Sequence, residues 1–221
     1  MIVKARNLKS KDKKIIPAIL TNNPADLKNK LIQLKGLTGW VHIDIMDGKF
    51  VNNVTITLKD LARMQISFQI EAHLLVFKPE KYFPDCKKAN IKRTIFHFEA
   101  TDNAKRVLQA MERFHFQRGL ALSPETPIKK INTYLDYIDL VLLMGVHPGF
   151  SGQKFIPGIL KKIANLKQIV PRMKIGVDGG IKLSNIQKIA QAGADQCVVN
   201  SALFGNKNIK KTFAQLQIKI R

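Results

Sequence analysis

Several features that would place a chain in a special class are missing from this sequence of 221 residues. No stretch comes near the roughly 20 uninterrupted apolar residues of a membrane span, although 45% of the residues are hydrophobic. The N-terminus lacks the apolar stretch and small-residue cleavage site of a secretory signal. We therefore expect a cytoplasmic globular protein with enough apolar material for a sizeable core.

Cysteine is also scarce. The chain has two cysteines, Cys86 and Cys197, and neither has a second Cys or a His nearby at the spacing of a metal site. Cys86 lies in a segment with a helical pattern and Cys197 in one with a strand-like pattern. The expectation is two buried free thiols in a reducing cytosol.

Acidic residues are few, since 16 Asp and Glu stand against 37 Lys and Arg and the net charge is +21. The excess is denser at the ends: residues 4–14 hold six basic side chains and one acid, and no acid follows Asp195. Such a field attracts phosphorylated substrates, nucleic acids or anionic membranes without choosing among them. No RNA- or DNA-binding motif accompanies the charge, so we expect neither a nucleic acid nor a membrane partner.

Low-complexity segments and long linkers are absent as well, which favours one domain over residues 1–221, with 1–14 as a basic N-terminal extension. Instead, short β-rich apolar runs alternate with helical stretches. The runs lie at 15–20, 40–46, 68–75, 94–97, 119–122, 140–144, 174–177 and 196–199. The helical stretches lie near 25–35, 58–64, 79–89, 103–114, 127–136, 157–169, 184–192 and 208–218.

Eight strands that alternate with eight helices predict a single α/β domain, a (β/α)8 TIM barrel with parallel strands. The alternative fold, an open doubly wound sheet, would carry a glycine-rich turn after its first strand, and residues 20–24 contain no glycine.

Helix-end signals accompany this pattern. Pro79 and Pro157 sit where the first turn of a helix tolerates proline. Ser184 and Asn208 are candidate N-caps, and Gly193 is placed to stop the helix before it.

Polar residues interrupt the apolar face of the second run. Successive strand residues point to opposite faces, so the β-branched residues of 41–46 share the face that meets the helices. His42, Asp44 and Met46 share the other face, which points into the barrel. A buried His and carboxylate are costly unless they pair or bind a metal ion.

The same alternation recurs on two further strands. Glu71 and His73 share the inner face of the third run, and Asp178 faces inward at the carboxyl end of the seventh. That end of a barrel carries the active sites of barrel enzymes. Two His and two Asp therefore converge, and imidazole with carboxylate suits Zn, Fe or Mn better than Ca.

Glycine-rich segments follow the last three runs. They are residues 147–153, 178–180 and 200–202, the last of which opens a short helix. In such barrels the loops after the seventh and eighth strands form a phosphate site, and glycine lets backbone N–H groups come close. The candidate substrate and phosphate residues are Gly149, Phe150, Ser151, Gly152, Gly179, Gly180, Asn200 and Ser201.

These segments together resemble a known family. The stretch His42-Ile-Asp-Ile-Met-Asp-Gly48 followed by Phe50-Val51 is similar to the signature of the ribulose-phosphate 3-epimerases. His73-Leu74, Met144–Gln153, Val177–Ile181 and Ala192–Asp195 also fit that family, and the resemblance runs from about residue 16 to residue 204.

The resemblance implies an isomerase that interconverts D-ribulose 5-phosphate and D-xylulose 5-phosphate by proton transfer at C3. It implies one divalent metal ion, Zn, Fe, Mn or Co, bound by His42, Asp44, His73 and Asp178, with Asp44 and Asp178 as the catalytic acid/base pair. Such a chemistry is coherent by itself, because inversion at carbon needs two carboxyl groups on opposite faces of a planar enediolate. We also expect a homo-oligomer, a dimer or a hexamer.

Met46 and Met144 are candidates to pack against the intermediate, although filling of the core is an equal alternative. Some residues depart from the family pattern. Ala18 replaces a serine, Leu75 a methionine, and Ser151 and Asn200 replace glycines. None of these changes removes a proposed ligand or base, and they bear on which substrate is chosen.

Three alternative functions stay open at this point. The first is epimerisation of another ketose phosphate, such as allulose 6-phosphate. The second is a decarboxylase or synthase on the same kind of barrel, but those relatives carry a lysine where this chain has Met46. The third is a basic, non-enzymatic descendant that binds nucleic acid.

Overall fold

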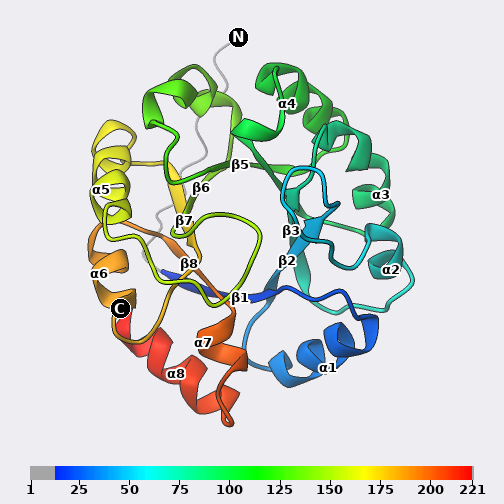
Figure 1. The fold of residues 1–221 in the computed structure, drawn as a ribbon, viewed down its shortest axis with the longest axis vertical. Coiled ribbons are helices and arrows are strands. Elements are labelled where there is room, and N and C mark those ends of the chain that lie inside the picture. Colours follow the sequence, from blue (N-terminus) through cyan, green and yellow to red (C-terminus); the bar gives the residue numbers. More distant parts are fainter. Residues whose placement is uncertain (1–12, 221) are drawn as a thin grey trace.

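The computed structural model describes residues 13–220, and its centre is a closed barrel of eight parallel strands (Figure 1). The strands follow one another around the ring in chain order, and β8 closes the ring by pairing with β1. They are β1 (Lys14–Ile19), β2 (Trp40–Met46), β3 (Gln69–Leu75), β4 (Arg93–His97), β5 (Gln117–Leu122), β6 (Leu140–Met144), β7 (Lys174–Asp178) and β8 (Gln196–Val199). The predicted (β/α)8 TIM barrel is confirmed.

Helices surround the barrel on all sides in Figure 1. The α-helices are α1 (Pro24–Leu34), α2 (Leu58–Ala62), α3 (Phe83–Lys88), α4 (Ala104–Arg113), α5 (Ile159–Ile169), α6 (Ile186–Gln191), α7 (Ser201–Phe204) and α8 (Ile209–Lys219). The 3-10 helices are η1 (Pro79–Tyr82), η2 (Phe98–Ala100) and η3 (Ile128–Tyr137). No helix among residues 13–220 is long and apolar enough to cross a membrane. The predicted basic extension lies almost wholly outside the described residues.

Some helix boundaries differ from the prediction. The stretch near 79–89 splits into η1 and α3, because Pro84 has no N–H to continue a helix through it. The stretch near 127–136 is a 3-10 helix. Ser184 does not cap α6; Asn185 holds the N-cap position, and its side chain accepts a hydrogen bond from the Lys182 amide instead. Pro157 precedes the N-cap of α5.

Other end signals are confirmed. The side chain of Asn208 accepts a hydrogen bond from the Lys211 amide and caps α8. Pro79 opens η1. Gly193 follows the end of α6 with a φ of 116°, a left-handed conformation that favours glycine.

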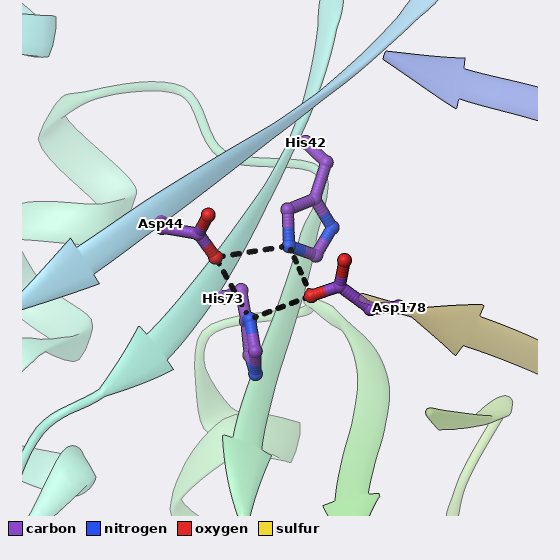
Figure 2. Close-up of side chains that lie close together, drawn as sticks. All are labelled: His42, Asp44, His73 and Asp178. Atoms are coloured by element: carbon purple, nitrogen blue, oxygen red, sulfur yellow. Dashed lines mark hydrogen bonds and ion pairs between the residues drawn. The ribbon is translucent and has the colours of Figure 1, made fainter. Parts of the chain in front are cut away.

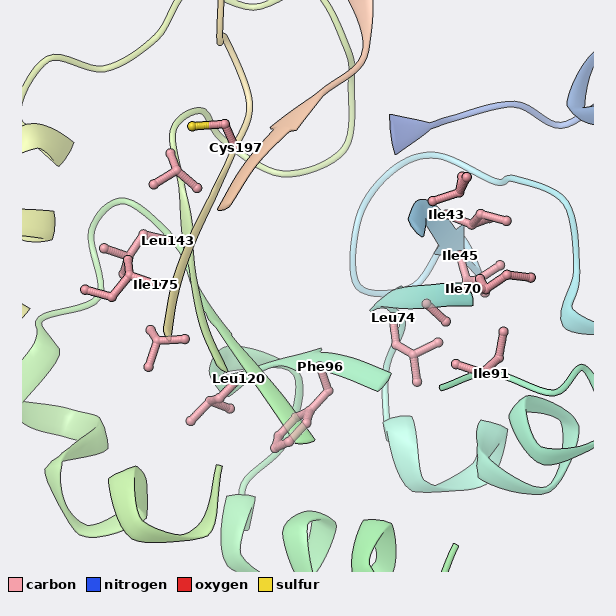
Figure 3. Close-up of a cluster of buried hydrophobic side chains, with 14 of the residues drawn as sticks. Ile43, Ile45, Ile70, Leu74, Ile91, Phe96, Leu120, Leu143, Ile175 and Cys197 are labelled. Carbon is pink, nitrogen blue, oxygen red and sulfur yellow. The ribbon is translucent and has the colours of Figure 1, made fainter. Parts of the chain in front are cut away.

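The alternation of the strands divides the core into two parts. The outward residues of the strands pack against the helices in one continuous cluster, part of which is shown in Figure 3. Ile43, Ile45 and Ile175 belong to it, as does Cys197, and each fully buried aliphatic side chain contributes about 1.5–3 kcal/mol relative to exposure. A smaller cluster of inward residues, among them Ala18, fills the barrel itself. Cys86 and Cys197 are both buried and free, as expected.

The pairing of β2 with β3 sets the level of the inward polar residues. In this register His42 lies opposite Glu71, and Asp44 lies opposite His73. Two consecutive polar pairs therefore point into the barrel at adjacent levels. Across the ring, Asp178 ends β7. The fold thus gathers charged groups from strands that are far apart in the sequence.

A candidate metal and acid–base centre

Four side chains meet at the carboxyl end of the barrel, as Figure 2 shows. One ligand atom from each of His42, Asp44, His73 and Asp178 lies within 4.8 Å of the others. Oδ1 of Asp44 is 2.9 Å from Nδ1 of His73 and 3.3 Å from Nε2 of His42. Oδ2 of Asp178 is 3.7 Å from the former nitrogen and 3.8 Å from the latter. The sequence prediction that these residues converge agrees with this geometry.

The two carboxyl groups differ in their affinity for protons. In the metal-free centre, burial opposes ionisation of Asp44, but the contacts with His42 and His73 outweigh it and hold the pKa of Asp44 well below its usual range. Burial raises the pKa of Asp178 to about 7, and the nearby charge of Asp44 adds to this rise while His42 opposes it. One carboxyl group is therefore ionised near neutral pH while the other holds a proton for part of the time.

The residue that orients His42, Glu71, lies deeper in the barrel. Nδ1 of His42 donates to Oε1 of Glu71 over 2.7 Å, and both side chains are fully buried. Glu71 also accepts a hydrogen bond of 2.7 Å from Arg93, whose guanidinium group lies over the Trp40 ring. Glu71 thus fixes the ring of His42 and turns Nε2 towards the centre.

The donor set fits a divalent metal ion. The inward atoms are two imidazole nitrogens and two carboxylate oxygens, the ligands that Zn, Fe, Mn or Co accept. His42 carries the proton for Glu71 on Nδ1, which leaves its Nε2 as the inward atom. Four electron-rich atoms held this close repel one another unless a proton or a cation lies among them.

A cleft opens above the centre. It contains about 560 Å³ of empty space, part of which is open to solvent. Every site residue predicted from the sequence lines it except His42, which lies beneath its floor. The lining includes Asp44, His73 and Asp178, the methionines Met46 and Met144, and the candidate phosphate residues Gly149, Phe150, Ser151, Gly152, Gly179, Gly180, Asn200 and Ser201.

The departures from the family pattern lie in the same cleft. Ala18 and Leu75 line it near the barrel strands, and Ser151 and Asn200 line it from the loops. Asn200 has a φ of −110°, so this position does not need the left-handed backbone for which glycine is chosen.

The loop after β6 is tied into place over the cleft. The side-chain amide of Gln153 donates to the carbonyl groups of His147 and Phe150 over 2.8 and 2.9 Å. The side-chain amide of Asn53, in the loop after β2, donates to the backbone carbonyl of Gly149 over 2.7 Å. The two loops are thus joined across the mouth of the barrel.

The second aspartate of the β2 motif has a separate role. Asp47 does not belong to the centre; it accepts hydrogen bonds from the Phe50 and Phe77 amides and from the Tyr82 hydroxyl. It therefore fixes the start of the loop that carries Phe50 over the barrel.

Sequence reasoning gave no role to three further residues. Glu71 was visible as an inward residue, but its contact with His42 depends on the register between strands. His97 ends β4 and contacts His73, and Glu99 follows it and contacts His97. The available signal was a polar His-x-Glu pattern at the end of an apolar strand.

Comparisons with known proteins agree with the geometry. The profile described as "Ribulose-phosphate 3 epimerase family" matches residues 14–204. A Bacillus subtilis (strain 168) protein named ribulose-phosphate 3-epimerase is 34% identical over 212 residues, covering 92% of this chain and 98% of that protein. A protein of the same name from Aquifex aeolicus (strain VF5) is 38% identical over 190 residues, covering 83% of this chain and 86% of that protein.

Solved structures with lower sequence identity share the fold. A 3-hexulose-6-phosphate synthase from Salmonella typhimurium has a TM-score of 0.72 and 11% identity, covering 94% of this chain and 98% of that one. A Mycobacterium tuberculosis tryptophan synthase has a TM-score of 0.71 and 16% identity, covering 96% of this chain and 94% of that one. At such identities the likeness shows the barrel fold alone.

Proposed function

The chain belongs to the ribulose-phosphate 3-epimerase family, and from this premise we propose that it interconverts D-ribulose 5-phosphate and D-xylulose 5-phosphate by metal-assisted proton transfer at C3. As an epimerase it is an isomerase. The observation that carries the proposal is the convergence of Asp44 and Asp178 with His42 and His73 at the floor of the cleft.

The two carboxyl groups come from separated strands. β2 and β7 are three steps apart around the ring, through β1 and β8. They therefore reach a substrate between them from different directions. Ionised Asp44 removes the proton from C3, and the electron pair of the broken C–H bond enters the enediolate. Asp178 then delivers its proton to C3 from the other face, and the roles exchange in the reverse reaction.

The different pKa values of the two carboxyl groups suit this division of labour. In the metal-free centre, contacts with His42 and His73 hold Asp44 ionised, whereas burial raises the pKa of Asp178 to about 7, which favours Asp178 over Asp44 as the group that carries the proton. A metal ion held by the four residues would supply positive charge that stabilises the oxygens of the enediolate.

The remaining cleft residues provide shape and charge. Met46 and Met144 offer apolar, polarizable surface beside the reacting carbons. The glycine-rich loops after β6 and β7, with Asn200 and Ser201 after β8, hold the phosphate group, as loops at this end of such barrels do. The relatives reported above carry the ribulose-phosphate name, which does not favour the allulose 6-phosphate or nucleic-acid alternatives.

The proton-transfer roles are tested by Asp44→Asn and Asp178→Asn. Each change keeps the size of the side chain but removes the carboxyl group that accepts and donates the proton, so each should lower kcat by at least about 100-fold. A coupled epimerase assay measures this, with Asp136→Asn as the control because Asp136 is exposed on η3. Near-normal turnover by either site variant would contradict the two-carboxyl mechanism.

The substrate and the metal ion are tested on the unaltered protein. The assay is run in parallel with D-ribulose 5-phosphate and D-allulose 6-phosphate, and elemental analysis measures the metal content of the purified protein. We expect turnover of the pentulose phosphate and about one metal ion per chain, one for each four-ligand centre. Turnover of the hexulose phosphate alone would overturn the substrate assignment.

A further inference from the structure

A line of polar side chains leads from the centre through two buried histidines to Glu99, which lies just after β4. Nε2 of His73 is 3.0 Å from Nε2 of His97, and Nδ1 of His97 is 3.2 Å from Oε2 of Glu99. Neither histidine has any exposed surface. The function proposed above uses Nδ1 of His73, on the opposite side of the ring, and leaves His97 and Glu99 without a role.

Glu99 is the fixed end of this line. Besides His97, it accepts hydrogen bonds from the Thr126 hydroxyl and, over 2.9 Å, from the Ser123 amide. Burial acts against the ionised form, but the hydrogen bonds from His97 and Thr126 lower the pKa of Glu99 to about 2. Glu99 therefore accepts hydrogen bonds from its neighbours and has no proton to donate.

Because Glu99 ends the line, it determines which nitrogen of His97 and which nitrogen of His73 carries a proton. Because Glu99 can only accept, the proton of a neutral His97 ring lies on Nδ1, and its Nε2 is a lone-pair acceptor. Two imidazole nitrogens 3.0 Å apart need one proton between them, so His73 donates from Nε2. In the metal-bound centre, where Asp44 and His73 would share the ion, Nδ1 of His73 then carries no proton and faces Asp44 and Asp178.

Packing holds the two rings in this arrangement. The rings of His73 and His97 are stacked with centroids 5.0 Å apart, and the Phe50 ring lies 5.0 Å from His97 on the loop that Asp47 fixes. Rotation of His97 away from His73 would require this loop to move.

The two histidines of the centre are therefore oriented by different carboxylates. Glu71 accepts directly from Nδ1 of His42 and leaves Nε2 inward. Glu99 acts through His97 on Nε2 of His73 and leaves Nδ1 inward. We infer that His97, held by Glu99, is the positioning residue that fixes the tautomer of His73 and so keeps its Nδ1 available to bind the metal ion, an inference that rests on the function proposed above.

The first test compares two substitutions of His97. His97→Phe keeps a flat ring but removes the acceptor for His73, whereas His97→Gln places an amide oxygen near the position of Nε2. We expect His97→Phe to weaken Zn²⁺ binding by about 10- to 100-fold, the usual effect of losing a partner of a metal ligand. His97→Gln should retain most of the affinity. Competition with a chromophoric chelator measures both.

Two controls accompany this comparison. His115→Asn removes an exposed histidine outside the centre, at a left-handed position that asparagine tolerates. Its Zn²⁺ affinity should equal that of the unaltered protein. Circular dichroism and urea unfolding of each variant show whether the barrel is intact.

The second test needs no variant. In ¹⁵N-labelled, Zn²⁺-loaded protein, the imidazole nitrogens report where each proton lies. We expect His97 to carry its proton on Nδ1 and His73 to carry its proton on Nε2. A proton on Nε2 of His97 would overturn the inference even if His97→Phe did not fold.

The outcomes separate the two levels of proposal. If the unaltered protein binds no Zn²⁺ at the centre, the metal part of the proposed function fails. If it binds Zn²⁺ and His97→Phe binds it equally tightly, the inference about His97 fails while the proposed function stands. Weaker binding by His97→Phe, recovered in His97→Gln, supports the inference.

Discussion

At the scale of single residues, the polar side chains around the centre of this barrel have partners. His42 has Glu71, His73 has His97, and Arg93 has both Glu71 and Gln196. An unpaired charge in such a place would cost several kcal/mol, so each partner is part of the reason that the centre can exist. The partner residues should therefore influence stability as well as chemistry.

Glu99 offers a test of this at the residue scale. Its pKa of about 2 in the folded chain lies below the ordinary value of 4.5. The ionised group therefore stabilises the fold above about pH 4.5, and this stability is lost as the pH falls towards 2. We expect Glu99→Gln to cost about 1–2 kcal/mol at pH 7, a value reduced for solvent screening of a partly exposed carboxylate.

The measurement is urea unfolding of the metal-free protein and of Glu99→Gln across this pH range. The difference in the free energy of unfolding between them should shrink as the pH is lowered from 5 to 2. A difference that stays constant with pH would show that ionised Glu99 contributes nothing beyond its shape.

At the scale of elements, strands place the chemistry and loops shape the cleft. The loop after β7 passes close to the loop after β6: a Cβ atom on Gly180 would lie 2.5 Å from the backbone nitrogen of Phe155. Gly180 also has a φ of 67°, in the left-handed region. Two separate requirements therefore select glycine here.

Gly180→Ala tests how these two loops fit together. Gly36→Ala is the matched control, because Gly36 has a similar φ of 77° but no atom within 4 Å of the added methyl group. The control should cost about 1 kcal/mol of stability from backbone strain alone. Gly180→Ala should cost more and should raise KM, because Phe155 must move beside the cleft.

Urea unfolding and steady-state kinetics measure these effects. Equal losses of stability in Gly180→Ala and Gly36→Ala, with KM unchanged, would show that the contact between the loops after β6 and β7 does not shape the substrate site.

At the scale of the whole molecule, charge is unevenly distributed. Within residues 140–220 the acids are Asp178 and Asp195, and neither is exposed. The exposed charges of that part, which includes the neighbouring helices α5, α6 and α8 of Figure 1, are all positive. They are Lys154, Lys161, Arg172, Lys182, Lys188, Lys207, Lys210, Lys211 and Lys219.

This field should attract a phosphorylated substrate. Lys182 and Lys188 line a second cavity that includes Gly180, next to the cleft. We expect kcat/KM to fall by about threefold or more as ionic strength rises from about 0.02 M to 0.2 M, with kcat unchanged, because salt screens the attraction. Stopped-time assays at several salt concentrations measure how steeply kcat/KM falls with ionic strength.

Charge-reversal variants show which basic residues cause the salt dependence of kcat/KM. Lys188→Glu should flatten the salt dependence more than Lys105→Glu, which alters an exposed residue on α4. Equal slopes in the two variants would mean that net charge, and not the basic side of the barrel, attracts the substrate.

Much of the fold follows directly from local sequence. The alternation within 41–46 and 174–178 fixes which side chains face inward, because a strand has a period of two whatever surrounds it. Asn208 and Gly193 mark helix ends through their own side chain or backbone. The prediction that Ser184 caps α6 was wrong, because the neighbouring Asn185 holds the N-cap position.

By itself, the sequence determined the barrel, the strands that carry His42, Asp44, His73 and Asp178, and the glycine-rich loops beside them. Only the tertiary structure decided that Glu71 orients His42, that Glu99 acts on His73 through His97, and that Asp44 and Asp178 hold protons differently. The reason is physical. Hydrogen bonds and pKa values depend on distances of a few ångströms between strands, and those distances are set by register and ring closure, which no local pattern contains.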